Sequence, residues 1–144
     1  MRALVATLVT LALCVATTTV AADEHTQWKL IGNPKHAGAT LDRTFVRNAF
    51  LRKETTWGDG ETIRPIDLPT KLPQREQFTR EVLKKTPAQL KSYWSQQIFS
   101  GKGVPPPEAE SPNDVVSYVL AHPGAIGYVP VDVDPHGAKV IEVR

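Results

Sequence analysis

A short cationic segment, 70–75, carries residue types that could bind an anion. Pro73 suits the first turn of a helix, where its missing N–H is no loss, so the pattern predicts a helix that begins inside the segment. The free N–H groups of a helix N-terminus attract anions, and a guanidinium can bind phosphate through two hydrogen bonds. The candidate ligand-binding residues here are Thr70, Lys71, Gln74 and Arg75. The competing interpretation is a solvated loop followed by charges on an exposed helix face.

A second polar segment, 33–36, follows the first apolar run after the N-terminal stretch. Its candidate ligand-binding residues are Asn33 and Lys35, with His36 beside them. Ligands of α/β folds bind at the carboxyl ends of strands, so we expect this segment to line one pocket together with 70–75. The competing interpretation is an ordinary surface turn.

The motifs that would indicate catalysis are missing from the sequence. No serine lies in a Gly-x-Ser-x-Gly elbow, no histidine pair has the His-Glu-x-x-His spacing, and no glycine-rich Walker loop is present. We therefore expect a protein that is not an enzyme and assign no catalytic residue. Asp132, Asp134 and His136 alternate as metal ligands on a strand would, but the flanking prolines favour a hydrophilic connector. We expect neither a metal nor a cofactor.

The composition indicates one globular domain. The 144 residues are 41% hydrophobic and 22% charged, which fits neither a disordered chain nor a disulfide scaffold. The net charge is only +2 at pH 7. Such a weak charge recruits neither nucleic acid nor an acidic membrane by itself, so we expect no nucleic-acid partner.

Residues 1–22 have the pattern of a secretory signal peptide. One arginine precedes an uncharged stretch, 3–20, and small residues stand before Asp23. A transmembrane anchor and a lipoprotein cleaved at Cys14 are the alternatives, but no cationic flank follows the apolar stretch and the residue before Cys14 is not small. Cleavage would remove the only cysteine, so the remaining domain, 23–144, would lack disulfides and thiol chemistry. We expect a periplasmic protein.

Apolar periodicity predicts alternating strands and helices. The expected strands are 28–31, 63–67, 125–129 and 139–143, and the expected helices are 41–51, capped by Thr40, and those beginning at Pro73, Pro87 and Pro112. The helix from Pro87 should bury Leu90, Tyr93, Trp94 and Ile98. Aromatic side chains such as Trp94 fit a core, with a ligand cleft as the alternative. Strands separated by helices predict an α/β layer with a mostly parallel sheet flanked by helices.

An ordered set of sequence blocks supports a resemblance to a known family. The blocks are Phe50-Leu51 with Trp57-Gly58-Asp59-Gly60 and Ile63–Asp67; Arg75 with Phe78; Tyr93-Trp94, Phe99 and Gly101-Lys102-Gly103 with Pro105-Pro106; and Pro123–Val129. In this order they resemble the phosphate ABC-transporter substrate-binding proteins. The resemblance is closer still to the short, single-lobe members of the type-2 periplasmic-binding-protein superfamily. It implies a single lobe of that fold.

The resemblance also implies an anion site, from which this chain departs. In full-length members two lobes close over phosphate, which a Ser-Gly-Thr segment at a helix N-terminus and an upstream arginine hold. The corresponding positions here are occupied by Leu72, Pro73 and Gln74, with Leu68 in place of the arginine. Pro73 has no N–H to donate. The chain is also too short for a second lobe, so we expect no tight phosphate capture.

These observations leave two hypotheses open. The first is a periplasmic solute-binding-like protein that binds a small oxyanion such as phosphate near 33–36 and 70–75, and works with a membrane transporter. The second is a degenerate scaffold that acts as a periplasmic interaction or sensor module, with another protein or a second copy of itself as partner. A concave basic pocket would favour the first. An exposed apolar patch in place of the missing lobe would favour the second.

Overall fold

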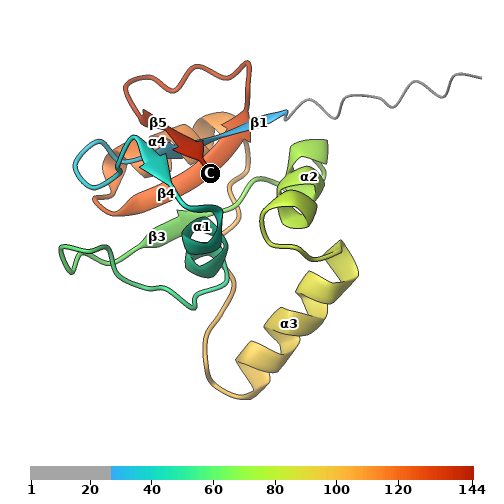
Figure 1. The fold of residues 1–144 in the computed structure, drawn as a ribbon. Helices are drawn as coiled ribbons and strands as arrows, with labels where there is room; N and C mark the ends of the chain where they lie inside the picture. Colours follow the sequence, from blue (N-terminus) through green and yellow to red (C-terminus); the bar gives the residue numbers. More distant parts are fainter. Residues whose placement is uncertain (1–26) are drawn as a thin grey trace, which may run out of the picture.

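The computed structural model describes residues 27–144, so the predicted signal peptide, 1–22, lies outside the described residues. The strands are β1 (Trp28–Gly32), β2 (Thr40–Leu41), β3 (Arg64–Ile66), β4 (Ala125–Pro130) and β5 (Lys139–Val143). The helices are α1 (Arg43–Phe50), α2 (Pro73–Glu81), α3 (Pro87–Phe99) and α4 (Pro112–Ala121) (Figure 1). The strands form one five-stranded sheet in the order β2-β5-β1-β4-β3. The predicted α/β class is thereby confirmed.

The direction of β1 corrects the expectation of a mostly parallel sheet. β1 lies between β4 and β5 and runs antiparallel to both, whereas β3 pairs parallel with β4 and β2 pairs parallel with β5. The sheet is therefore mixed. The apolar run at 28–32 indicates a strand inside the sheet. Such a run has the same sequence pattern whether the neighbouring strands are parallel or antiparallel to it.

The sheet is covered on both faces, and β4 shows how. Gly127 packs against Val115 of α4 so closely that a Cβ at residue 127 would lie 2.6 Å from the Val115 side chain. The next residue, Tyr128, points to the other face and stacks on Phe78 of α2 with ring centroids 3.8 Å apart. Phe50 of α1 meets both rings edge-on. The alternation along β4 thus places α4 on one face and α1 with α2 on the other (Figure 1).

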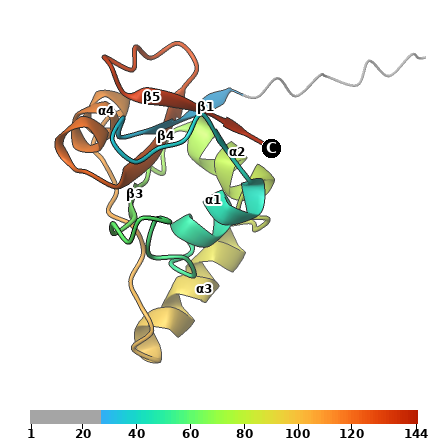
Figure 2. The ribbon, with the colours of Figure 1, turned by 60° about the vertical axis from the view of Figure 1, so that its left-hand side comes forward.

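Helix α3 begins as the sequence predicts but leaves the core at its far end. Thr86 and Gln89 form a reciprocal capping box at its N-terminus, with Pro87 in the first turn. Leu90 and Trp94 are buried, as expected. The prediction that Ile98 is buried is wrong, since this side chain is 55% exposed. Figure 2 shows the reason: α3 extends beyond the helices that cover the sheet, so its last turn has no layer to pack against.

The expected helix 41–51 begins later than predicted. Thr40 and Leu41 form the edge strand β2 beside β5, instead of a helix cap and first turn. Asp42 caps α1, because its carboxylate accepts hydrogen bonds from the N–H groups of Thr44 and Phe45. A short carboxylate is a strong N-cap, so the cap moves to Asp42 and leaves the two preceding residues free to pair with the sheet.

Candidate functional site

The strand directions separate the two polar segments that were expected to share a pocket. The C-terminal end of β1 pairs with the start of β4, as Gly32 lies opposite Ile126. The start of β3 lies at the same edge, with Arg64 opposite Ala125. Segment 33–36 is therefore at the edge where β3 begins, and segment 67–75 follows the end of β3 at the opposite edge. The expectation of one shared pocket is wrong, because it assumed that β1 and β3 run in the same direction.

Segment 33–36 is bound to the rest of the fold through its own polar groups. Asn33 is buried, and its side-chain amide donates to the carbonyl oxygen of Val119 at 3.0 Å while its oxygen accepts from the N–H of Lys35. His36 Nδ1 lies 2.8 Å from a carboxylate oxygen of Asp59. Lys35 has an exposed side chain. The segment therefore fastens β1 to the end of α4 and to the turn at Asp59.

Segment 67–75 lies beside the proline-rich stretch that precedes α4. The N–H of Asp67 donates to the carbonyl of Pro107, and the N–H of Ala109 donates to the carbonyl of Asp67, both at 2.9 Å. These two bonds fix Glu108 next to the end of β3. A carboxylate far along the chain is thus brought to the segment that sequence patterns identified as cationic.

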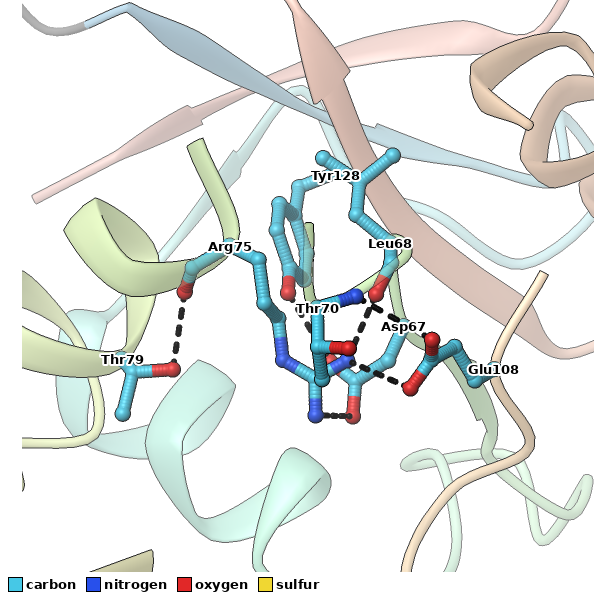
Figure 3. Close-up of polar contacts among 7 residues, drawn as sticks. All are labelled: Asp67, Leu68, Thr70, Arg75, Thr79, Glu108 and Tyr128. Atoms are coloured by element: carbon cyan, nitrogen blue, oxygen red, sulfur yellow. Dashed lines mark hydrogen bonds and ion pairs between the residues drawn. The ribbon is translucent and has the colours of Figure 1, made fainter. Parts of the chain in front are cut away.

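Arg75 is the centre of this site (Figure 3). Its side chain is only 15% exposed, and its Nη2 lies 3.3 Å from a carboxylate oxygen of Asp67. Its Nη1 donates to the carbonyl of Leu68 at 2.6 Å and lies 3.8 Å from a carboxylate oxygen of Glu108. The guanidinium expected to bind an external anion is therefore held by groups of this chain.

Asp67 lies beside the Arg75 guanidinium and is buried. The hydroxyl of Tyr128 donates to its second carboxylate oxygen at 3.0 Å (Figure 3). Burial raises the pKa of Asp67 to about 6, even though Arg75 and the Tyr128 hydroxyl act to lower it. Burial also raises the pKa of Tyr128 well above its usual value, so this phenol remains a donor at physiological pH. Asp67, Arg75 and Tyr128 form a structural unit that joins segment 67–75 to β4.

Glu108 lies against the backbone of Thr70 and the guanidinium of Arg75. One carboxylate oxygen accepts the N–H of Thr70 at 3.1 Å, and the other faces Arg75 (Figure 3). The side chain of Glu108 is 45% exposed. In the described part of the chain, Lys71 and Gln74 make no hydrogen bond or ion pair through their side chains, and Lys71 is exposed. Segment 70–75 thus binds a carboxylate, but one that the chain itself supplies.

Two hollows meet at Thr70 and Glu108, both of which line each of them. The smaller, of about 390 Å³, is bounded by Pro69, Lys71 and the stretch 108–110. The larger is a groove of about 770 Å³ between α2, α3 and segment 105–108. Glu108 therefore lines both the smaller hollow and the groove that Trp94 also lines.

The other candidate residues have structural surroundings. His136 donates its backbone N–H to the Asp134 carboxylate within a turn, and no trio of His, Cys, Asp or Glu side chains in residues 27–144 is placed to hold a metal ion. Trp57 donates its indole N–H to the Gly124 carbonyl, and Tyr93 donates its hydroxyl to the Leu51 carbonyl. None of the helices within 27–144 has the length and apolar character needed to cross a membrane.

Sequence reasoning missed Asp67, Glu108 and Tyr128 as members of the site. Asp67 and Tyr128 lie inside the sequence blocks that support the resemblance, but nothing local showed that they touch. The pairing of Glu108 with segment 67–70 depends on a contact between distant stretches. The signal that could have found the cluster is Asp67 itself, an acid at the end of the predicted strand 63–67, because an acid that is buried is almost always paired.

No protein-family profile and no curated protein matches the sequence. Solved structures do match: a phosphate ABC transporter substrate-binding protein with bound phosphate from Clostridium perfringens, at 17% identity with a TM-score of 0.63, covers 81% of this chain and 44% of its own. PstS from Borrelia burgdorferi matches at 11% identity with a TM-score of 0.63, and the matched region comprises 82% of this chain and 47% of PstS. A phosphate transport receptor from Vibrio cholerae has 14% identity and a TM-score of 0.60, with coverages of 81% and 46%.

The comparisons bear on fold and length. The chain spans less than half the length of the solved proteins that it matches. At these identities the likeness concerns the backbone, and the site residues of those proteins do not transfer with it. The resemblance predicted from the sequence blocks is confirmed at the level of the fold: the chain has the architecture of about one half of a phosphate ABC transporter substrate-binding protein.

Proposed function

We propose that this protein is a solute-binding-like module that takes a small anion at segment 70–75. The observation that carries the proposal is the position of the Glu108 carboxylate, which accepts the Thr70 N–H and faces Arg75. A site that already holds a carboxylate has the donors that an external anion needs. The fold supports the same class of function, because the matched protein from Clostridium perfringens contains bound phosphate.

Glu108 sets the affinity of this site. An external anion has to displace a carboxylate that is tethered next to its donors, so its apparent affinity is reduced by the effective concentration of that side chain. Lys71 remains as an exposed cation at the mouth of the smaller hollow and attracts the incoming anion. The proposed binding residues are therefore Thr70, Lys71, Gln74 and Arg75. Asn33 and Lys35 lie at the other edge of the sheet and take no part.

The proposed setting is the periplasm. Residues 1–22 would direct export and be removed, which leaves a domain without cysteine. A membrane transporter is the proposed partner if the bound anion is carried into the cell. No catalytic role is proposed for this site.

A thermal-shift titration with phosphate, sulfate and acetate tests the proposal. A ligand that binds only the folded state stabilises it by about 2.7 kcal/mol at a hundredfold excess over its dissociation constant. We expect a saturable rise in Tm that is reduced in Lys71→Ala and enlarged in Glu108→Gln. Lys102→Ala, a cation outside both hollows, is the matched control and should behave like the wild type. If no anion shifts Tm in Glu108→Gln, anion binding at this segment is ruled out.

One observation favours the second candidate function, a protein-interaction module. Three apolar side chains at the end of α3 and in the loop after it are open to solvent: Ile98 at 55%, Phe99 at 95% and Val104 at 58% exposure. Exposed apolar side chains near one another are typical of contact surfaces. The test is sedimentation velocity of the wild type and of Phe99→Asp. A concentration-dependent dimer that Phe99→Asp abolishes would support a second copy as partner, and a monomer throughout would exclude it.

A further inference from the structure

The larger groove has an apolar floor and a charged end. Along α3, Leu90, Trp94 and Ile98 line it at a spacing of four residues, and Pro105 and Pro106 form the facing side. Arg75 closes one end, next to Thr70 and Glu108. A volume of about 770 Å³ lies within the usual range of small-molecule sites. The groove therefore combines an apolar surface with a preformed carboxylate position.

A second cation stands beside the apolar floor. Lys91 lines the groove from α3, one residue after Leu90, and has no ion pair within the described residues. The other acid of the groove, Glu76, is paired with Arg80 at 2.8 Å and is directed to the surface of α2. The cations that line the groove are thus Lys91 and Arg75. Arg75 keeps its contacts with Asp67 and the Leu68 carbonyl, and Glu108 is the groove acid that a ligand carboxylate has to displace.

We propose that this groove binds an organic carboxylate with an apolar body, such as an arylalkanoic acid. The proposal rests on the proposed function and names its ligand class. The carboxylate of the ligand replaces that of Glu108 on the Thr70 N–H and Arg75, and its apolar body covers Trp94, Leu90 and Ile98. No covalent bond is made or broken, and the displaced Glu108 side chain moves into solvent, to which it is already partly open.

The geometry favours this class over an inorganic oxyanion. A phosphate ion at Thr70 would fill only the charged end and would leave the apolar side chains of the groove in contact with water. An apolar body removes that surface from water, which is the main source of affinity in such sites. The group now bound at the charged end is a planar carboxylate, so a ligand carboxylate reproduces contacts that the fold is already built to make.

The test compares three probes: 3-phenylpropionate, 3-phenylpropan-1-ol and acetate. Trp94 faces the groove and reports binding through its fluorescence, and Trp94→Phe separates its signal from that of Trp28 and Trp57. We expect 3-phenylpropionate to bind at least tenfold more tightly than acetate and than the alcohol. Acetate supplies the charge without the body, and the alcohol supplies the body without the charge.

Two pairs of variants locate the site. Glu108→Gln should tighten 3-phenylpropionate binding severalfold, and Glu142→Gln, an exposed acid outside both hollows, should leave it unchanged. Ile98→Ser should weaken it severalfold without loss of folding, since this side chain is largely exposed. Val140→Ser, a similarly exposed apolar residue on β5, should leave it unchanged.

The outcomes separate this inference from the proposed function. If acetate and 3-phenylpropionate bind equally well, the inference is overturned while the anion site stands. If the alcohol binds as tightly as the carboxylate, the charged end has no role in the groove and the inference is overturned, whereas the anion site is decided by acetate and phosphate. If no probe binds even to Glu108→Gln, both fail. If 3-phenylpropionate binds but Glu108→Gln does not tighten it, the displacement of Glu108 is refuted and the groove assignment with it.

Discussion

The two polar segments that follow β1 and β3 are similar in residue type, but their polar groups bind different kinds of partner. Asn33, at the end of β1, bonds to backbone groups, among them the carbonyl of Val119 at the end of α4. Thr70 and Arg75, beyond β3, meet the carboxylate of Glu108, which is a movable side chain. A backbone partner cannot leave without local unfolding, whereas a half-exposed carboxylate can leave by rotation about its own bonds. The comparison shows how a candidate binding segment can be told from a structural one: its polar groups contact a side chain that a ligand can replace, instead of backbone groups.

Removing the cation at the centre of the second segment should have the largest effect on stability. In Arg75→Met the buried Asp67 loses its counter-ion, and breaking a buried pair from one side costs about 3–5 kcal/mol. Urea unfolding at pH 7 measures the loss. At pH 5 the loss should be smaller, because Asp67 is then largely protonated in the folded state. An equal loss at both pH values would contradict an ionised Asp67 at pH 7.

The pH dependence of stability tests the protonation of Asp67 in the cluster of Asp67, Arg75 and Tyr128. The pKa of Asp67 is about 6 in the folded state against 3.8 for an ordinary aspartate, so the unfolded chain releases this proton first as pH rises. The contribution of Asp67 to stability therefore falls between about pH 4 and pH 6 and is constant above that range. Two pKa units correspond to about 3 kcal/mol as an upper bound.

Asp67→Asn removes this titration and provides the measurement. The free energy of unfolding of the wild type minus that of Asp67→Asn should decrease between pH 4 and pH 6.5. A difference that is flat, or that rises with pH, would mean that the Arg75 ion pair outweighs the burial of the carboxylate. Asp132→Asn, an exposed acid in the turn after β4, is the matched control for the loss of a carboxylate on the surface.

Truncating Asn33, which anchors the first segment, should lower the free energy of unfolding by less than Arg75→Met does, but by a measurable amount. Asn33→Ala leaves a carbonyl at the end of α4 without its donor and the N–H of Lys35 without its acceptor. The buried carbonyl left without a donor costs about 1–3 kcal/mol, and we expect a loss at the middle of that range in urea unfolding. A loss below 0.5 kcal/mol, the usual scale of a surface change, would break the contrast between the two segments.

The smallest expected effects separate the two exposed lysines by function. Lys35→Ala and Lys71→Ala should each change stability by less than about 0.5 kcal/mol, because both side chains are exposed. Only Lys71→Ala should weaken anion binding in the thermal-shift titration. If Lys35→Ala weakens it equally, the segment at the end of β1 belongs to the site after all.

Local chemistry made much of the fold predictable. Thr86-Pro87 with Gln89, and Ser111-Pro112, start helices through contacts within a few residues, and both starts are where the sequence places them. The short apolar runs at 28–32 and 125–130 are strands, as their local residue pattern predicts. Each of these features is decided by residues that are close in sequence.

The rest depends on contacts between distant residues. The direction of β1 is decided by β4 and β5, about a hundred positions away, and it put Asn33 and Arg75 at opposite edges of the sheet. Thr70, Lys71, Gln74 and Arg75 could be proposed as site residues because they stand together in sequence. Glu108 could not, because its place beside Thr70 follows from backbone bonds between Asp67 and the stretch 107–109.

Those backbone bonds on either side of Glu108 also bear on how fast a ligand could enter. The carbonyl of Pro107 and the N–H of Ala109 hold the chain in place whether or not the Glu108 carboxylate is engaged. The exchange of one carboxylate for another needs only side-chain rotation, which for exposed residues takes picoseconds to nanoseconds. Association would then be limited by diffusional encounter, with a rate that falls as salt screens Lys71 and Lys91, and no slow opening phase should precede it.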